Sequence, residues 1–436
     1  MNIRNKQILN LALPSIISNI TVPLLGLVDL AIVGHLNNIA LIGAVAVATT
    51  IFNVQYWLLG FLRMGTSGLT AQALGKRNFH EVLKVLLRAF FIATSISLLL
   101  IAMQQGVLWG ALKMMKPSNS VATFVEVYFN ICIWGAPATL GHYVLNGWFV
   151  GVQNTKIPMF VAIFQNIVNI LASLLFVFVF KMDIAGVALG TLISQWLSFF
   201  VSVGLLFLNY SKLRKYLSFN NLWNKEELKR FFNVNRDIFL RTLFLVLVNL
   251  FFVARGTRQG DLILSANTLL MTFFSIFSYV LDGFAFAAEA LCGKAFGAKD
   301  LCSFKNYTSH LLRWGIGLAL VGTLLYIGGG HFFLTLITNS KVVLSVSSDY
   351  FYWVVLIPLS GYLAFVLDGV FIGATMTRYM LVSSFLAAIC FFAIYFLFSS
   401  LLGNHALWLA FILFLFVRGI VEKVLLNRVQ LKLIDK

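Results

Sequence analysis

The side chains best suited to bind an ion are polar groups that lie within long apolar stretches. The first is Asp29, in the segment LLGLVDLAIVG. Removal from water favours the neutral form of a carboxyl group, so Asp29 is expected to bind and release a proton near neutral pH. Tyr128, in another apolar stretch, has a hydroxyl that can donate a hydrogen bond to such a carboxylate. A purely structural hydrogen-bonding role for Asp29 is the alternative.

Amide and hydroxyl side chains form a second group of candidates. In a helix, Asn166, Asn169 and Ser173 lie on one face, because they are spaced three and four residues apart. Thr191 and Gln195 repeat the four-residue spacing in the next apolar stretch. The oxygens of these side chains can serve a proton network or coordinate a sodium ion. Hydrogen bonds that hold neighbouring helices together are the competing interpretation.

Acidic residues also occur in apolar stretches of the second half. Asp237 and Arg241 are four residues apart, which predicts a local ion pair on one helix. Asp282 and Glu289 are seven residues apart and share a helix face, where they can attract a cationic substrate or form buried structural pairs. Asp368 is a further candidate for this substrate cleft.

Two residues of the first half have a mechanical or charge-balancing role in this interpretation. Pro14 precedes Asp29 in the same apolar stretch. It removes one helix hydrogen bond and should kink the helix, either as a hinge or simply as part of its shape. Arg63 can neutralise a carboxylate in the cleft, or it can extend its guanidinium group towards the surface.

These polar groups are rare in a chain whose composition excludes an ordinary water-soluble protein. Of its 436 residues, 60% are hydrophobic and 11% are charged, with a mean hydropathy of +0.92. Soluble domains average about 45–50% apolar and about 25% charged residues. The net charge of +17 indicates basic cytoplasmic loops rather than nucleic-acid binding. The four cysteines and six histidines lack metal-ligand spacing, so no disulfide or metal site is expected.

Apolar stretches long enough to cross a bilayer, about 20 residues each, define the expected elements. The sequence predicts an all-α polytopic membrane protein with twelve transmembrane helices in two six-helix lobes. The expected spans are 8–33, 39–73, 81–109, 121–150, 157–180, 184–209, 235–255, 262–295, 304–337, 343–373, 378–401 and 405–430. We expect an N-terminal lobe at 1–208, a cytoplasmic linker at 209–234 and a C-terminal lobe at 235–436.

Lys and Arg are unevenly distributed between alternate loops. With the N-terminus in the cytoplasm, the cytoplasmic loops and ends carry more than three times as many of them as the outer loops. Cytoplasmic loops are enriched in these residues. The chain is therefore expected in the cytoplasmic (inner) membrane, with both termini on the cytoplasmic side.

The two halves of the chain resemble each other at an offset of 222 residues. The segment LNGWFVGVQNTK (Leu145–Lys156) aligns with LDGVFIGATMTR (Leu367–Arg378). Each half has an even number of spans, so the halves enter the membrane in the same direction, related by a pseudo-two-fold axis along the membrane normal. Two lobes around a central cleft suit alternating access better than a fixed pore.

Motifs for ATP hydrolysis or for enzyme catalysis are missing from the sequence. It contains no GxxxxGK[ST] loop, and no nucleophile–base set is recognisable. The protein is therefore expected not to be an enzyme, to need no cofactor, and to draw on an ion gradient for active transport.

Five segments carry a resemblance to a known family. They are Val28–Leu36 (VDLAIVGHL), Tyr56–Ala73, Asn235–Thr242, Phe277–Gly297 and Phe371–Thr375. With them, nearly the whole chain resembles the multidrug and toxic compound extrusion (MATE) transporters, specifically the bacterial DinF-type branch. The resemblance implies two six-helix lobes and export of drugs or toxic organic compounds in exchange for protons or sodium.

The resemblance also implies roles for single residues. Asp29 matches the first-helix acid of cation coupling, and Pro14 matches the proline that bends this helix. The positions that fall in the family's N-terminal-lobe network are Tyr128, Asn146, Asn169 and Thr191. Ser173 stands where DinF-type members often have a second acid. Since one carboxylate suffices for a proton, protons are the expected coupling ion and sodium is the alternative.

The expected partners are the lipid bilayer and small organic substrates of hydrophobic or cationic character, with no nucleic acid, and the protein is expected to be a monomer. The main alternative is a flippase for a lipid-linked precursor of the same superfamily. A flippase should have a strongly cationic cleft, and few arginines lie at membrane depth. A major-facilitator-type carrier is disfavoured because the loop GKRNFHE (Gly75–Glu81) lacks that family's basic motif. A receptor or channel is the remaining alternative, which substrate-dependent proton flux would exclude.

Overall fold

The structure, a computed structural model, is built from helices, as the composition predicts. It describes residues 3–36, 38–217 and 222–434, and no β-strand occurs in these ranges. Helices satisfy their own backbone hydrogen bonds, which a chain in lipid requires. Two compact units are present. We call Ile17–Leu228 the N-terminal unit, and Met1–Ile16 together with Lys229–Lys436 the C-terminal unit.

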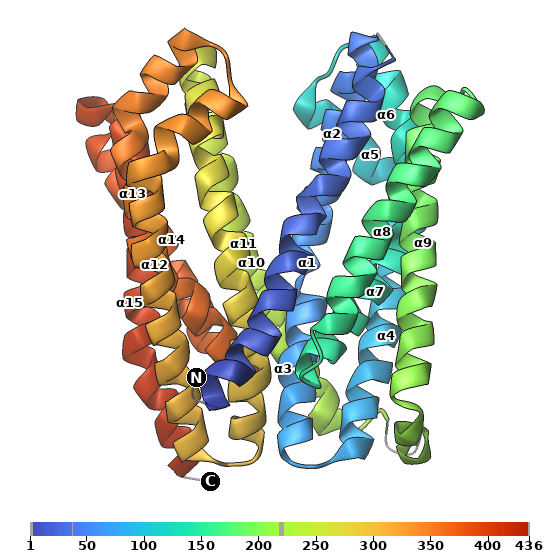
Figure 1. The fold of residues 1–436 in the computed structure, drawn as a ribbon, viewed down its shortest axis with the longest axis vertical. Coiled ribbons are helices and arrows are strands. Elements are labelled where there is room, and N and C mark those ends of the chain that lie inside the picture. Colours follow the sequence, from blue (N-terminus) through green and yellow to red (C-terminus); the bar gives the residue numbers. More distant parts are fainter. Residues whose placement is uncertain (1–2, 37, 218–221, 435–436) are drawn as a thin grey trace. The chain divides into compact units, whose positions relative to one another are not determined.

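The N-terminal unit contains the larger part of the first helix and the helices that follow it (Figure 1). Helix α1 (Ile3–Gly34) begins in the C-terminal unit and ends in the N-terminal unit. The further α-helices are α2 (Ile39–Leu58), α3 (Phe61–Gly75), α4 (Phe79–Ala102), α5 (Gln104–Met115), α6 (Asn119–Cys132), α7 (Ala136–Gly151), α8 (Lys156–Leu174) and α9 (Asp183–Asn209). Short helical segments are η1 (Ile133–Gly135), the π-helix η2 (Leu175–Val179) and η3 (Ser211–Tyr216).

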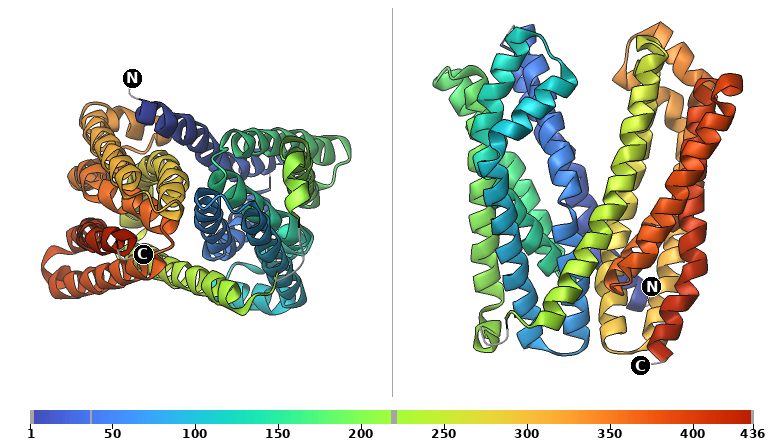
Figure 2. Two further views of the ribbon diagram at one scale, coloured as in Figure 1. Left: turned by 90° about the horizontal axis from the view of Figure 1, so that it is seen from below. Right: turned by 180° about the vertical axis from the view of Figure 1, so that it is seen from behind.

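The C-terminal unit is organised around one central helix. Its helices are α10 (Lys225–Arg258), α11 (Asp261–Gly297), α12 (Leu301–Ile337), α13 (Lys341–Gly373), α14 (Thr377–Leu402) and α15 (Asn404–Ile434). Helix α13 packs against α11, α12 and α15, and 72% of its apolar span is buried. Helices α14 and α15, at the red end of the colour scale, lie side by side (Figure 2).

The expected spans are recovered with differences at their boundaries. Eleven helical segments of the described residues are long and apolar enough to cross a membrane. Two of them are broken, because Ala40–Gly75 consists of α2 and α3, and Asn119–Gly151 contains η1 between α6 and α7. The expected span 81–109 is shorter, since α4 ends at Ala102. Helix α15 covers the twelfth expected span, 405–430.

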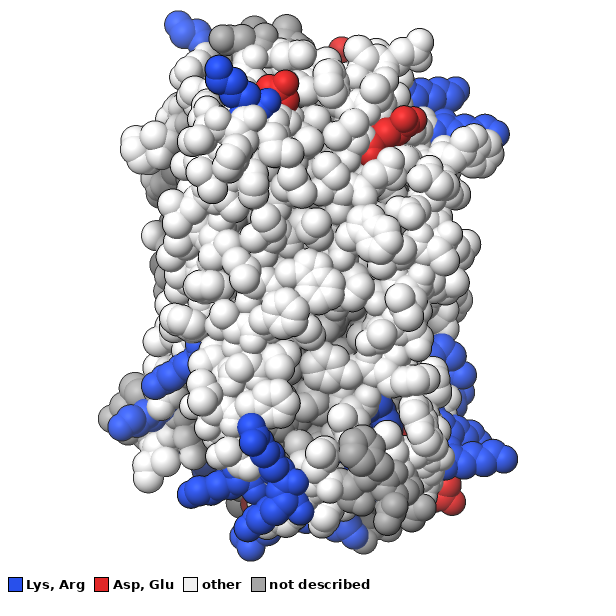
Figure 3. All heavy atoms as spheres, turned by 90° about the vertical axis from the view of Figure 1, so that its right-hand side faces the viewer, with Lys and Arg blue, Asp and Glu red and all other residues white. Residues whose placement is uncertain are grey.

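Charged side chains leave a broad band of the surface free. On the face in Figure 3, Lys, Arg, Asp and Glu lie at the two ends, and Lys and Arg gather at the lower one. Large apolar side chains on α8 and α9 are exposed, among them Leu171 at 63% and Phe200 at 58%. Such a surface is costly in water and suits the hydrocarbon core of a bilayer.

The compact units differ from the expected lobes at the beginning of the chain. The first turns of α1 pack on the C-terminal unit through α12, where the hydroxyl of Tyr307 donates to Gln7 Oε1 at 2.7 Å. The indole of Trp314, also on α12, donates to Asn5 Oδ1 at 3.3 Å. The C-terminal unit is therefore built from two separate parts of the sequence.

The expected linker, 209–234, is partly helical, and residues up to Leu228 belong to the N-terminal unit. His80 on α4 donates through Nδ1 to the carbonyl of Tyr216 at 2.8 Å. Arg88, which is buried on the same helix, donates through Nε to the carbonyl of Leu222 at 2.7 Å. The polar stretch is thus held on α4 at these points.

The repeat predicted from the sequence is present in the helix packing. A Cβ atom at Gly147 would lie 2.2 Å from the carbonyl oxygen of Arg63, and one at Gly369 would lie 2.3 Å from that of Ala285. The glycines are 222 residues apart, and so are the two carbonyl groups. Helices α3 and α7 therefore approach each other in the same way as α11 and α13, and only glycine permits this approach.

The turns repeat at the same offset. Asn78 caps α4 by accepting from the backbone N–H of Glu81, and Asp300 caps α12 by accepting from that of Ser303. Hydrogen bonds from Ser303 hold the pKa of the Asp300 carboxyl below its usual value. Positive φ angles occur in the pairs Arg77 (56°) and Lys299 (58°), Gln153 (66°) and Thr375 (51°), and Lys181 (54°) and Gly403 (53°). The prediction of an internal repeat is confirmed.

We expect Gly147→Ala and Gly369→Ala to destabilise the protein, because the added methyl group meets a backbone oxygen that no side-chain rotation can move. Overpacking of this kind costs about 1–3 kcal/mol. Gly204→Ala and Gly317→Ala are matched controls, since a methyl group there has no neighbour within 4 Å. Thermal unfolding in detergent is the measurement. Equal unfolding temperatures for the test and control variants would contradict the close approach.

Candidate functional site

Asp29 is buried in the N-terminal unit and accepts hydrogen bonds from two other helices. It is 2% exposed. The hydroxyl of Tyr128 on α6 donates to Asp29 Oδ2 at 3.2 Å, and the hydroxyl of Thr191 on α9 donates to the same oxygen at 2.9 Å. Hydrogen bonds to an ionised acceptor are stronger than those between neutral groups. One carboxyl group thus joins α1, α6 and α9.

A fourth helix joins this arrangement through Asn169 on α8. The amide Nδ2 of Asn169 donates to the hydroxyl oxygen of Thr191 at 3.0 Å, so this hydroxyl accepts one hydrogen bond while it donates another to Asp29. We call Asp29, Tyr128, Asn169 and Thr191 the Asp29 network. Its members come from four helices, and the sequence had suggested all of them.

Ser173 lies one helical turn after Asn169, at the contact between α8 and α9. A Cβ atom at Gly190 would lie 2.2 Å from Ser173 Oγ. The glycine therefore lets α9 approach α8 closely, immediately before Thr191. This approach brings the hydroxyl of Thr191 within reach of Asn169.

Other predicted residues of this region do not join the Asp29 network by hydrogen bonds between described residues. Asn166 donates instead to the carbonyl of Ala162 on its own helix at 2.9 Å. The amide oxygen of Asn146 on α7 is buried and accepts no hydrogen bond from a described residue. Gln195 packs against η1, where a Cβ atom at Gly135 would lie 1.8 Å from its Oε1.

Buried oxygens at the Asp29 network suit a small cation. Within the described residues, Asp29 Oδ1, Asn169 Oδ1 and Ser173 Oγ are buried without a hydrogen-bond partner. A buried polar atom without a partner costs about 1–3 kcal/mol, and a bound proton or monovalent cation would satisfy such acceptors. The set contains a single carboxylate, so its ionised form carries one negative charge.

The equivalent position in the C-terminal unit has no such chemistry. At the offset of 222, Asp29, Asn169 and Thr191 correspond to Phe251, Phe391 and Leu413, and Ser173 corresponds to Tyr395. Tyr128 alone keeps its residue type, as Tyr350. The ring of Phe251 packs on that of Tyr395, with centroids 5.1 Å apart, and on that of Phe391, with centroids 5.8 Å apart. The Asp29 network is therefore specific to the N-terminal unit.

The C-terminal unit has a different polar centre, and its ion pairs correct one prediction. Arg241 on α10 pairs with Asp368 on α13, both buried, and not with Asp237 on its own helix. Asp237 instead pairs with Arg236 at 3.0 Å and accepts from the hydroxyl of Thr377 at 3.3 Å. The predicted Asp237–Arg241 pair is wrong: Asp237 is also buried, but its carboxylate is taken up by Arg236 and Thr377, and the guanidinium of Arg241 reaches Asp368 on α13 instead.

Residues of α15 complete this centre, and sequence reasoning did not assign them. Arg418 also pairs with Asp368, with 3.3 Å between Nη2 and Oδ2. Glu422, one helical turn further, is fully buried. We call Arg241, Asp368, Arg418 and Glu422 the Asp368 cluster. The four-residue spacing of Arg418 and Glu422 in an apolar helix was the signal that could have found them.

The remaining cleft candidates lie on α11 and α3. Asp282 is half-buried on α11. Glu289 is 1% exposed, and its backbone oxygen faces Gly373 where α11 packs on α13. Arg63 is half-buried on α3, at the contact with α7. Their contact with a substrate stays a prediction.

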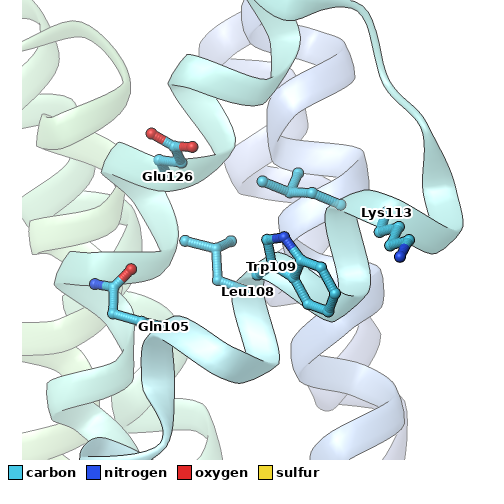
Figure 4. Close-up of a pocket in the computed structure, with 6 residues that line it drawn as sticks. Gln105, Leu108, Trp109, Lys113 and Glu126 are labelled. Carbon is cyan, nitrogen blue, oxygen red and sulfur yellow. The ribbon is translucent and has the colours of Figure 1, made fainter.

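A hollow that the sequence did not suggest lies between α5 and α6. Its volume is about 340 Å³, and its lining residues are Gln105, Leu108, Trp109, Leu112, Lys113 and Glu126 (Figure 4). The ammonium group of Lys113 lies 4.7 Å from the ring centre of Trp109. None of the predicted site residues lines this hollow.

Comparison with known proteins gives the family. The sequence profile described as MatE matches residues 14–175 and 238–398. The chain belongs to the MATE family. The profile matches once in each half, in agreement with the repeat. This match confirms the family to which the sequence analysis assigned the chain. MATE proteins are multidrug and toxin efflux transporters.

Relatives and solved structures extend this result. DNA damage-inducible protein F of Escherichia coli is 36% identical over 424 residues, which cover 95% of this chain and 90% of that protein. Protein DETOXIFICATION 42 of Arabidopsis thaliana is 27% identical, over 71% of this chain and 57% of that protein. A MATE crystal structure in the straight conformation has a TM-score of 0.88 at 17% identity, and the match covers 99% of this chain and 97% of that one. The structure of an outward-facing MATE transporter has a TM-score of 0.87 at 17% identity, and the match covers 99% of this chain and 96% of that one. These structures show the MATE fold.

We expect Thr191→Val to destabilise this MATE protein, because it removes a donor from Asp29 and the acceptor of Asn169. Hydrogen bonds to charged groups contribute about 1.5–3 kcal/mol. Thr191→Ser retains the hydroxyl and is the matched control. Thermal unfolding in detergent compares them, and a valine variant as stable as the serine variant would argue against the network.

Double-mutant cycles should separate the observed ion pair from the one expected from the sequence. Asp368→Asn leaves the buried guanidinium groups of Arg241 and Arg418 without their counter-charge, which costs about 3–5 kcal/mol. Arg241→Gln leaves Asp368 paired with Arg418 alone, so it should cost less. Their effects should be coupled by about 0.5–3 kcal/mol. The same cycle for Asp237→Asn and Arg241→Gln should be additive. Coupling in the second cycle and additivity in the first would reverse the assignment.

Proposed function

We propose that the protein exports small organic compounds in exchange for protons, and that Asp29 is the residue that binds the proton. The observation that carries this proposal is the Asp29 network: one buried carboxyl group with two hydroxyl donors on Oδ2 and no partner on Oδ1 within the described residues. A proton requires only one such oxygen, whereas a sodium ion needs several oxygen ligands and gains from a second acid. Ser173 provides no second charge.

Protonation of Asp29 from outside would neutralise the charge to which Tyr128 and Thr191 donate. Both hydrogen bonds would weaken, and the packing of α1 against α6 and α9 would change. Pro14 lies in the same helix, two residues before the boundary between the compact units. Because Pro14 cannot donate a backbone hydrogen bond, this part of α1 is the hinge at which the helix would bend.

The coupling requires that proton and cargo prefer opposite states of the transporter. In this scheme the protonated state has the lower affinity for cargo and releases it outwards. The cargo is a hydrophobic or cationic organic compound, in keeping with relatives such as a probable multidrug resistance protein, NorM of Bacillus anthracis, at 23% identity. We further propose that the transporter works as a monomer in the cytoplasmic membrane, with both termini in the cytoplasm.

A flippase for a lipid-linked precursor is the alternative, and the Asp368 cluster argues against it. An anionic lipid headgroup would need guanidinium groups that are free to bind it. Arg241 and Arg418 both pair with Asp368, so their charge is already balanced inside the C-terminal unit.

We expect Asp29→Asn to abolish proton-driven export, because an amide cannot take up a proton in this range of pH. Proteoliposomes with an imposed pH gradient or an imposed sodium gradient, and a fluorescent organic cation as cargo, provide the measurement. The wild type should respond to the pH gradient alone. Glu126→Gln is the control, since Glu126 is exposed on α6, outside the Asp29 network. Full pH-driven export by folded Asp29→Asn protein, or export driven by sodium alone, would overturn the proposal.

A further inference from the structure

Arg255, near the end of α10, lies against three aromatic rings. Its guanidinium carbon is 5.0 Å from the ring centre of Phe251, one helical turn earlier, and 5.4 Å and 5.8 Å from those of Tyr395 and Phe396 on α14. Cations are attracted to the faces of aromatic rings. The rings therefore hold the guanidinium group at the contact between α10 and α14, whereas an arginine that only reached for water would extend away from the helices.

The positive charge of Arg255 has no counter-charge among the described residues. The residue is half-buried, yet its guanidinium group forms no ion pair and donates no hydrogen bond to another described residue. Arg258, one turn further along α10, is exposed and also has no such partner. The next acid along the chain, Asp261, is exposed at the beginning of α11 and pairs with neither. A guanidinium group has five N–H donors in a planar fork that matches a phosphate group, so this end of α10 presents unused donors and an excess of positive charge.

Arg255 stands where the hydrocarbon core of the bilayer is expected to give way to lipid headgroups. It is the last residue of the expected span 235–255. The apolar side chains that precede it on α10 and adjoin it on α14 are exposed, with Leu250 at 50%, Phe396 at 59% and Leu397 at 66%. Acyl chains cover such a surface in a membrane. The donors of Arg255 therefore lie at the level at which lipid phosphate groups accompany these chains.

This arrangement is specific to the C-terminal unit. At the offset of 222 residues, Arg255 and Arg258 correspond to Val33 and Leu36. The N-terminal unit therefore has two aliphatic side chains where the C-terminal unit has two cations. The aromatic rings that take the place of the Asp29 network in the C-terminal unit are also the rings on which Arg255 rests.

We propose that Arg255 and the three rings around it form a binding site for an anionic phospholipid of the membrane. Arg255 donates to the headgroup phosphate, Arg258 adds a second positive charge, and the acyl chains lie on the exposed apolar side chains of α10 and α14. A lipid is favoured over free phosphate because the donors adjoin a surface that acyl chains cover. The site goes beyond the proposed export, and its occupancy can be measured without any transport.

The test is native mass spectrometry of the purified full chain in detergent, with phosphatidylglycerol, phosphatidylcholine of the same acyl chains, and inorganic phosphate as probes. The wild type should bind phosphatidylglycerol most tightly. Loss of the charged donor in Arg255→Gln should weaken this binding about tenfold. Lys341→Gln is the matched control, because it removes an exposed positive charge at the beginning of α13 that has no partner among the described residues. It should leave the affinity unchanged.

The comparison of probes on the wild type keeps the test independent of how the variants fold. Equal affinity for the two lipids, or binding of inorganic phosphate as tight as that of phosphatidylglycerol, would overturn the proposal. So would an equal loss of lipid in Arg255→Gln and Lys341→Gln. Thermal unfolding gives a second measurement, because a ligand of the folded state stabilises it. Phosphatidylglycerol should raise the unfolding temperature of the wild type and of Lys341→Gln more than that of Arg255→Gln, and equal shifts in all three would contradict the site.

Discussion

The low polarity of the bilayer is the constraint on which the rest of the structure depends. It requires helices, because a backbone in lipid has to satisfy its own hydrogen bonds. It also makes each buried polar side chain expensive, so the few that are present come together. Asp29 gathers hydroxyl donors from α6 and α9, and Asp368 gathers guanidinium groups from α10 and α15. The requirement that produces the scaffold therefore also concentrates its chemistry in two places.

The two repeats share their backbone geometry but differ in their buried polar residues. Turns with positive φ and close helix contacts recur at the same offset, from Arg77 and Lys299 to Gly147 and Gly369. The buried ionisable residues do not recur: Phe251 stands at the position of Asp29, and Asn146 stands at the position of Asp368. Backbone geometry is fixed by steric contacts that few residues satisfy. A buried polar centre can be lost wherever aromatic side chains fill its volume, as they do around Phe251.

The sequence predicted those parts of the structure that depend on local properties. Apolar length predicted the helices, and one acid in an apolar stretch pointed to Asp29. The breaks after α2 and α6 were not predicted, because the apolar composition continues through them. The partner of Arg241 was also missed, since Asp368 is 127 residues away in the chain and spacing along one helix favoured Asp237. The residues that touch a substrate stay a prediction of the sequence.

The first turns of α1 have a consequence for the synthesis of the chain. Asn5 and Gln7 hydrogen-bond to Trp314 and Tyr307 on α12, so these early residues belong to the unit that is translated last. The N-terminal unit can assemble as soon as residue 228 is made. Until α12 has been made, the opening turns of α1 lack these two hydrogen-bond partners. The C-terminal unit is therefore begun first and completed last. Cutting the gene between the two repeats would separate that unit from the first turns of α1.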